Sequence, residues 1–171
     1  MQVLAATVVA LAGCGTTATS VSASQLASST RPAPAACPAT TPPDRSGADT
    51  SDGSVMVPGH PATVLVCPYP GYNPPAPGSP APKSARTDGA ALARLVNALP
   101  EPPGGTMNCG ADTGERDVLY FVYAATGRAL QVVVERTGCH GVASAFGRRW
   151  SPPGDPAAMR LTDRLRALTG A

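Results

Sequence analysis

Two apolar runs stand out in the second half of the chain. Residues 118–123 read VLYFVY, and residues 130–135 read LQVVVE. Short runs of β-branched and aromatic residues are typical of strands, and the Thr126-Gly127 pair between them is typical of a hairpin turn. The pattern therefore predicts two antiparallel strands joined by a two-residue turn.

Such a turn fixes which side chains face each other. Three apolar pairs then lie in a row on one side of the hairpin: Tyr123 with Leu130, Phe121 with Val132, and Leu119 with Val134. The other side carries Gln131 and Glu135 among apolar residues. We therefore expect the first side to face a core and the second side to be half covered.

A third strand is predicted over Thr63–Cys67, a mostly β-branched run between Pro61 and Pro68. Because proline cannot donate a hydrogen bond to the ladder, we expect this strand at or near a sheet edge. Six prolines from Pro70 to Pro82 predict a long surface loop after it.

Two helices are predicted from apolar positions at helical spacing. Asp88 can cap the first, which runs to Leu99 and has its apolar face at Leu92, Leu95, Val96 and Leu99. Asp155 and Pro156 can begin the second, which ends near Gly170 and has its apolar face at Ala158, Leu161, Leu165 and Leu168. Together these elements predict an α+β domain over residues 55–171. We expect a small antiparallel sheet of three or four strands with two helices on one face, preceded by a disordered stalk.

The amino terminus has the form of an export signal. Val3–Leu11 is apolar or small without interruption, whereas a membrane-spanning helix needs roughly 20 apolar residues. This run predicts the hydrophobic region of a signal peptide that covers residues 1–13. The sequence Leu11-Ala12-Gly13-Cys14 resembles the lipobox of bacterial lipoproteins, in which small residues admit the peptidase and the cysteine carries the lipid.

The resemblance implies that the mature chain begins at Cys14 and is anchored by acyl chains such as palmitate to the outer face of the cell membrane. The alternative is a signal peptide without lipid, in which Cys14 is incidental. One Lys against twelve Arg, in a chain rich in Ala, Pro and Gly, is similar to exported lipoproteins of actinobacteria. No catalytic residue can be carried over from so broad a class.

Residues 14–54 show few of the apolar positions that a core needs. Nine of the fifteen residues from Thr16 to Thr30 are Ser or Thr, and five prolines follow up to Pro43. This composition predicts a lipidated, disordered tether that holds the domain clear of the headgroups.

The cysteine count supports export. Lipidation of Cys14 leaves four of the five cysteines, the number expected for two disulfides in an exported domain. Three pairings are possible. Because Cys109 and Cys139 lie beyond the same open end of the predicted hairpin, we expect them to pair, which leaves Cys37 with Cys67.

Candidate catalytic residues are few. His140 beside Cys139 suggests a metal site or a thiol nucleophile, but both need a free thiolate, and we expect Cys139 to be oxidised. His140, Ser144 and Asp155 are the ingredients of a hydrolase triad, but the nucleophile elbow is missing from the sequence. We therefore assign no catalytic residue.

The acidic segment from Asp112 to Asp117 has two further interpretations. Asp112-Thr113-Gly114 matches the tripeptide of aspartic proteases, but neither a preceding apolar strand nor a second copy is present. Asp112, Glu115 and Asp117 carry oxygens that suit Ca²⁺ but lack EF-hand spacing. We expect a solvated loop here, with no metal and no cofactor in the protein.

The surface candidate for binding is Arg148-Arg149-Trp150. Arginines beside the only tryptophan suit contact with sugars, anionic lipid or a partner carboxylate, although Trp150 covering the sheet edge is the alternative. A scattered net charge of +2 gives no indication of nucleic-acid binding.

These observations predict a membrane-anchored, non-enzymatic binding module of the cell envelope. Its expected partners are the membrane, through the lipid anchor, and a cell-wall polymer or an envelope protein. The alternative is a surface hydrolase that uses His140 with a nearby Ser or acid.

Overall fold

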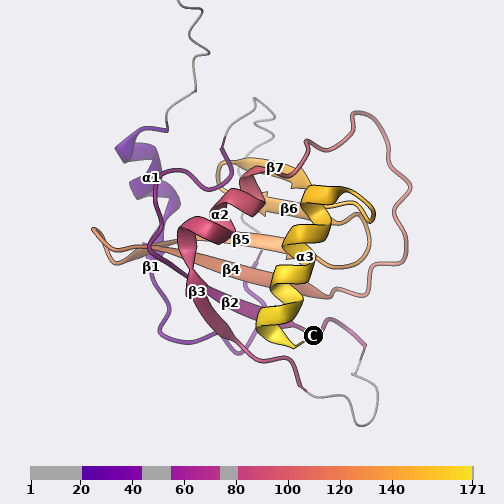
Figure 1. Ribbon diagram of the computed structural model, residues 1–171, viewed down its shortest axis with the longest axis horizontal. Coiled ribbons are helices and arrows are strands. Elements are labelled where there is room, and N and C mark those ends of the chain that lie inside the picture. Colours follow the sequence, from indigo (N-terminus) through magenta and orange to yellow (C-terminus); the bar gives the residue numbers. More distant parts are fainter. Residues whose placement is uncertain (1–20, 44–54, 74–80, 171) are drawn as a thin grey trace, which may run out of the picture.

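The computed structural model describes residues 21–43, 55–73 and 81–170, in which one antiparallel sheet carries two helices across one face (Figure 1). The strands are β1 (Arg31–Pro32), β2 (Thr63–Tyr69), β3 (Ala85–Asp88), β4 (Arg116–Tyr123), β5 (Arg128–Glu135), β6 (Gly141–Ser144) and β7 (Gly147–Trp150). The helices are α1 (Ala23–Ser29), α2 (Gly89–Asn97) and α3 (Pro156–Thr169). The strand order is β3-β2-β4-β5-β6-β7, and β1 pairs with the beginning of β5.

The sheet is larger than the sequence predicted. Seven strands take part, so the expectation of three or four strands is wrong, although the fold is α+β overall. The strands that the prediction missed, β1, β3, β6 and β7, have two or four residues each. Such strands are too short for alternation to be visible, and Gly, Ser and Arg replace β-branched residues in most of them.

Capping residues mark the starts of the two predicted helices. The Asp88 side chain accepts a hydrogen bond from the Ala91 amide at 2.6 Å, and α2 ends two residues before the predicted Leu99. Asp155 caps α3, and Gly170, with φ of 70°, ends it in a left-handed conformation. The third helix, α1, was not predicted, because its Ser-rich and Ala-rich sequence has no apolar face.

The hairpin of β4 and β5 has the predicted faces but not the predicted register. Phe121 pairs with Leu130, and Leu119 pairs with Val132. The turn contains four residues, 124–127, instead of two, which moves the pairing by two positions. Since side chains alternate with a period of two, a shift of two leaves every side chain on its predicted face.

Strand β2 is second from one edge of the sheet, which agrees with the expected position at or near an edge. It lies between β3 and β4, and β3 pairs with Thr63–Val66 only. Pro68 lies beyond that contact and pairs with β4 alone, opposite Asp117. The missing donor of Pro68 is therefore tolerated because β3 ends before it.

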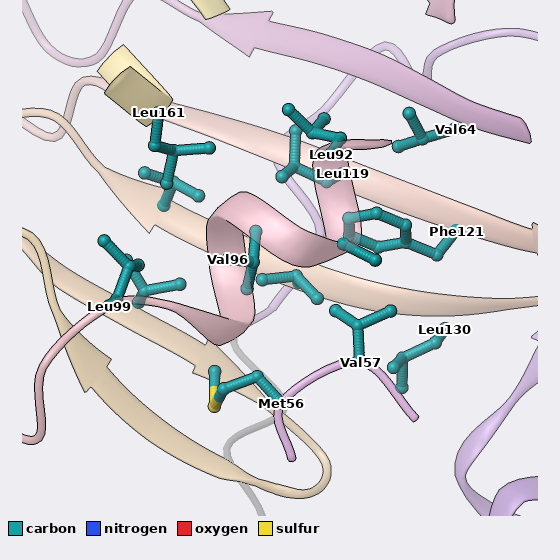
Figure 2. Packing of buried hydrophobic residues seen from close by; sticks show 14 of the residues in the cluster. Met56, Val57, Val64, Leu92, Val96, Leu99, Leu119, Phe121, Leu130 and Leu161 are labelled. Carbon is teal, nitrogen blue, oxygen red and sulfur yellow. The ribbon is translucent and has the colours of Figure 1, made fainter. Parts of the chain in front are cut away.

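The larger core lies between the helices and one face of the sheet. Leu92 and Val96 of α2 pack with Leu161 of α3 against Leu119 and Phe121, and all five are fully buried. Figure 2 shows these side chains converging between α2 and the strands. Burying one apolar side chain of this size contributes about 1.5–3 kcal/mol, so this core is the main source of stability.

The opposite face is covered by residues 30–43, which we name the strap. Its residues Ala33 and Cys37 pack against a smaller buried cluster that includes Leu65, Tyr120 and Val133. The Cys37–Cys67 disulfide attaches the strap to β2. Together with Cys109–Cys139, it gives the pairing that the sequence predicted.

Hydrogen bonds to strap carbonyl groups add to this attachment. Tyr69 Oη donates to the Pro38 carbonyl at 2.9 Å, Arg86 Nη2 donates to the Ala35 carbonyl at 2.6 Å, and Gln131 Nε2 donates to the Pro43 carbonyl at 3.0 Å. A proline-rich segment has few N–H donors but keeps all its acceptors, so side chains of the sheet can hold it.

The prediction of a disordered stalk is therefore wrong for residues 21–43. Composition predicted disorder because it shows neither the distant donors nor the disulfide partner. The expected signal peptide 1–13, the expected lipid site Cys14 and the expected boundary between residues 54 and 55 lie outside the described residues. Within the described part of the chain, no helix is long and apolar enough to cross a membrane.

Candidate binding site

The chain turns sharply between β5 and β6, at residues 136–140, which we name the Cys139 corner. Gly138 and His140 have left-handed backbone conformations, with φ of 71° and 54°. His140 is the one non-glycine residue with positive φ in the described ranges, and histidine tolerates this conformation better than most residues. A Cβ atom at Gly138 would lie 2.9 Å from Cβ of Asp112, so glycine is required there.

The Cys109–Cys139 disulfide attaches a second segment to this corner. Residues 98–115 connect α2 to β4 without a helix or strand. The disulfide fixes the middle of this connection beside His140. Met107, two positions before Cys109, lines two surface hollows that Trp150 also lines.

Three hollows adjoin the Cys139 corner. The disulfide hollow, of about 380 Å³, is lined by the disulfide, Arg136, His140 and Trp150. The Trp150 hollow, of about 310 Å³, has Val133, Ala143, Arg148 and Trp150 among its lining residues. The α3 hollow, of about 650 Å³, lies between the corner and α3 and has Arg136 and His140 in its wall. Volumes of this size are typical of small-molecule sites.

The structure divides the predicted Arg148-Arg149-Trp150 site. Arg148 is exposed, whereas Arg149 is only 8% exposed and lies 3.9 Å from a carboxylate oxygen of Glu101. Strand alternation places Arg148 and Trp150 on the same face of β7 and Arg149 on the other. Arg149 therefore has a structural position, and Arg148 and Trp150 remain the candidates for contact with a partner.

Trp150 is half-buried and is held by the corner. Its indole Nε1 donates to the carbonyl of Cys139 at 2.9 Å, and its backbone amide donates to the carbonyl of Pro100 at 2.9 Å. Trp150 therefore belongs to the edge strand β7, and it lines two hollows.

The three residues considered for a hydrolase triad are not brought together. Ser144 lies at the far end of β6 from His140, where its buried hydroxyl donates to the Met56 carbonyl at 3.0 Å and accepts from the Phe146 amide. The Asp155 carboxylate accepts from two backbone amides at the start of α3. Ser144 and Asp155 both have structural hydrogen bonds.

The acidic segment is also dispersed. Asp112 accepts from the Gly114 amide at 2.8 Å in a local turn, while Asp117 lies inside β4 with its side chain 1% exposed. Within the described ranges, no group of three His, Cys, Asp or Glu residues is placed to hold a metal ion.

Asp117 forms a buried ion pair with Arg136. Arg136 Nε donates to Oδ2 of Asp117 at 2.7 Å, whereas Oδ1 has no hydrogen-bond partner in the described part of the chain. Burial raises the pKa of the Asp117 carboxyl above its ordinary value, and the charge of Arg136 opposes this rise only in part. Arg136, which lines the α3 hollow, is therefore paired with a buried carboxylate that has one oxygen without a hydrogen-bond partner.

Sequence reasoning missed Arg136 and the α3 hollow. One signal was present, because Asp117 stands at an inward position of β4, beside the apolar Val118 and Leu119. A buried carboxylate needs a cation, and Arg136 follows the partner strand directly. The hollow itself depends on how α3 packs against the corner, which periodicity does not show.

Comparison with known proteins does not identify the chain. No protein-family model, no curated protein and no solved structure matches it.

Proposed function

We propose that the chain is an exported lipoprotein, anchored through Cys14 to the outer face of the cell membrane, whose domain binds an envelope component through Trp150 and Arg148. The partner is a cell-wall polymer or another envelope protein. Two disulfides support export, because such bonds persist in oxidising compartments. The binding assignment depends on one observation: Trp150 lines two adjoining hollows and shares its face of β7 with an exposed arginine.

The anchor in this proposal is shorter than the sequence predicted. Described structure begins at Val21, seven residues after Cys14, and continues into α1 and the strap. Seven residues span at most about 25 Å, even fully extended. The lipidated chain would therefore keep the start of α1 close to the membrane surface.

This short anchor gives the domain an orientation. Arg128, at the β4–β5 turn, donates to carbonyl groups of Ala27 and Thr30, so α1 lies at the turn end of the hairpin (Figure 1). The Cys139 corner follows the other end of β5. An eight-residue strand is about 26 Å long, so the hollows lie on the side of the domain away from the anchor.

Two measurements test this proposal separately. Metabolic labelling with a clickable palmitate should mark the wild type and leave Cys14→Ala unmarked; equal labelling of the two would exclude the anchor. Because Trp150 is the only tryptophan, its fluorescence in the purified protein reports binding directly. Titration with soluble cell-wall polymer or with an envelope-protein fraction should change the emission.

Variants of exposed arginines make the fluorescence test specific. Arg148→Ala should weaken the response, and Arg160→Ala, on the exposed face of α3, should leave it unchanged. Equal responses in the two variants would exclude the Trp150 face. His140→Ala should preserve binding. If His140→Ala instead abolishes function while its melting curve matches that of the wild type, the result would favour the hydrolase.

A further inference from the structure

We propose that the Cys109–Cys139 disulfide is a thiol-exchange site, which an external dithiol reductant opens while the strap disulfide and the folded domain stay intact. Opening releases residues 98–115 from the Cys139 corner and thereby regulates the Trp150 face, a second step that rests on the proposed function. Three observations carry this proposal: the exposure of the cysteines, the attachments of residues 98–115 and the position of Trp150.

The two disulfides differ in their exposure. Cys109 is exposed and Cys139 is half-buried, and both line the disulfide hollow of about 380 Å³. Cys67, in contrast, is fully buried, and Cys37 packs with it in the smaller core cluster. A thiolate must reach one sulfur of a disulfide in order to attack it. An external thiol therefore reaches Cys109 directly, but it reaches the strap disulfide only through the half-buried Cys37.

The leaving sulfur adds to this difference. Attack on Cys37 expels the thiolate of Cys67 into an apolar cluster, where a charged sulfur is poorly solvated. Attack on Cys109 expels the thiolate of Cys139 at a half-buried corner that borders a surface hollow. Opening of the Cys109–Cys139 disulfide is therefore the faster reaction.

The exchange takes place in two steps. In the first, a thiolate of the dithiol forms a bond to Sγ of Cys109, the bond between the two cysteine sulfurs breaks, and its electron pair leaves with Sγ of Cys139, which takes up a proton. In the second, the other thiolate of the reductant attacks the reductant's own sulfur in the mixed disulfide and releases Cys109 as a thiolate, which is protonated in turn. The dithiol is oxidised to a disulfide, and the protein gains two electrons and two protons.

The Cys109–Cys139 disulfide holds the middle of an exposed connection. Every residue from 101 to 112 is exposed except Met107, which is half-buried. This stretch has neither helix nor strand, and so exposed a backbone has little burial to hold it in place. Reduction therefore frees the stretch to move away from the Cys139 corner.

The two ends of the connection stay attached after reduction. The Pro100 carbonyl accepts from the Trp150 amide at 2.9 Å, and the Thr113 amide donates to Oγ1 of Thr137 at 3.1 Å. Met107 lies midway between these ends and lines two hollows that Trp150 also lines. Reduction therefore removes Met107 from the walls of these hollows, whereas Trp150 stays in β7. The oxidised protein is thus the form that binds the partner.

Differential alkylation tests the exchange without any partner. The oxidised full-length protein in detergent is treated with dithiothreitol, free thiols are alkylated at intervals, and peptide mapping gives the rate at each cysteine. We expect Cys109 and Cys139 to become alkylated at least about tenfold faster than Cys37 and Cys67, because access controls the rate. Equal rates, or faster opening of the strap disulfide, would overturn the proposal.

Unfolding provides the matched control, since both disulfides join residues 30 positions apart. In concentrated urea the two disulfides should open at nearly the same rate. A difference that persists unchanged in urea would come from the local sequence and not from the fold, and would overturn the proposal. Loss of the native circular-dichroism spectrum during the fast phase in buffer would overturn it as well.

Trp150 reports the opening as it happens. It lines the disulfide hollow, and its Nε1 donates to the Cys139 carbonyl at 2.9 Å. A disulfide beside an indole quenches its fluorescence by accepting an electron from the excited ring, so the emission should rise as Cys109–Cys139 opens. Cys109→Ser with Cys139→Ser should show no such rise. A rise that follows only the alkylation of Cys37 and Cys67 would overturn the assignment.

The regulatory step is tested by the titration with cell-wall polymer or an envelope-protein fraction. Cys109→Ser with Cys139→Ser keeps the connection open, and binding should weaken about two- to tenfold, because a mobile wall must be ordered on binding. Met107→Ala should reproduce part of this loss in the oxidised protein. Equal affinity of the double variant and the wild type would overturn the regulation. An absent response in the wild type would exclude the proposed function together with its regulation, whereas the alkylation result stands on its own.

Discussion

The two faces of the sheet are covered in different ways. Helices α2 and α3 cover one face with a continuous apolar core that contains fully buried Leu92, Leu119 and Phe121. The strap covers the other face with irregular backbone, one disulfide and hydrogen bonds to proline and alanine carbonyl groups. One face is held by buried apolar area and the other by a disulfide and hydrogen bonds. Mutations on the two faces should therefore change the stability of the protein in different ways.

The largest effect is expected on the helix-covered face. Phe121→Ala should lower the free energy of unfolding by about 3–5 kcal/mol, because it leaves a cavity at the centre of the larger core. Urea unfolding followed by circular dichroism measures the change. Arg160→Ala, at an exposed position, should stay within about 0.5 kcal/mol of wild type. A loss below about 1 kcal/mol in Phe121→Ala would mean that this core is not the main source of stability.

Removing the strap disulfide should have the next largest effect. Cys37→Ala with Cys67→Ala should cost roughly 3–4 kcal/mol in the loop-entropy model. The matched control is Cys109→Ala with Cys139→Ala, since both disulfides join residues 30 positions apart and predict the same loop term. Any difference in the free energy of unfolding between the two double variants therefore comes from contacts in the native state.

Limited proteolysis shows where each double variant opens. We expect cleavage within residues 30–43 when Cys37–Cys67 is removed, and within residues 98–115 when Cys109–Cys139 is removed. Identical cleavage patterns would contradict the view that the strap is a separately attached cover.

A smaller effect is expected from one hydrogen bond of the strap. Tyr69→Phe removes the hydroxyl that donates to the Pro38 carbonyl and keeps the ring. The free energy of unfolding should fall by about 0.5–1.5 kcal/mol, the usual contribution of one such bond. Tyr69→Phe in the background without Cys37–Cys67 should have almost no effect, because the strap is then already released; an unchanged cost would show that the hydrogen bond acts alone.

The smallest effect concerns the buried carboxylate below α3 and depends on pH. Because burial raises the pKa of Asp117 above 3.8, the folded state binds this proton more tightly than the unfolded state. The contribution of Asp117 is then most favourable at low pH and is lost as pH rises through its folded pKa. Wild type should lose stability relative to Asp117→Asn over this range.

Urea unfolding of the two proteins from about pH 3 to pH 7 measures this difference. In a protein that keeps Asp117, Arg136→Gln should increase the loss of stability with rising pH, because the guanidinium that opposes the rise in the pKa of Asp117 is gone. A wild type that gains stability relative to Asp117→Asn as pH rises would mean that the ion pair outweighs burial.

The sequence predicted the elements that are marked by a local pattern, such as a helix cap or the alternation of a strand. Asp88 and Asp155 mark the starts of α2 and α3, and the alternation in β4 and β5 marks their inward faces. The hairpin register was wrong because Thr126-Gly127 occupies the end of a four-residue turn instead of forming a two-residue turn. A shift of two residues leaves the alternation of apolar and polar positions unchanged, so the sequence pattern could not have shown the correct register.

The remaining features depend on contacts between distant residues. The strap is held by Tyr69, Arg86 and Gln131, which lie 31 to 88 positions away from their acceptors. Trp150 was singled out by composition, but the two hollows that it lines require the position of residues 98–115. Local patterns carry no information on either arrangement.

The two disulfides have a consequence for the biogenesis of the protein. Each joins cysteines that are consecutive among the four, and the two covalent rings neither overlap nor interlock. In the exported chain that we propose, Cys37 and then Cys67 would leave the translocation channel before Cys109 appears. Oxidation in the order of emergence would then produce the native connectivity without a later exchange of partners.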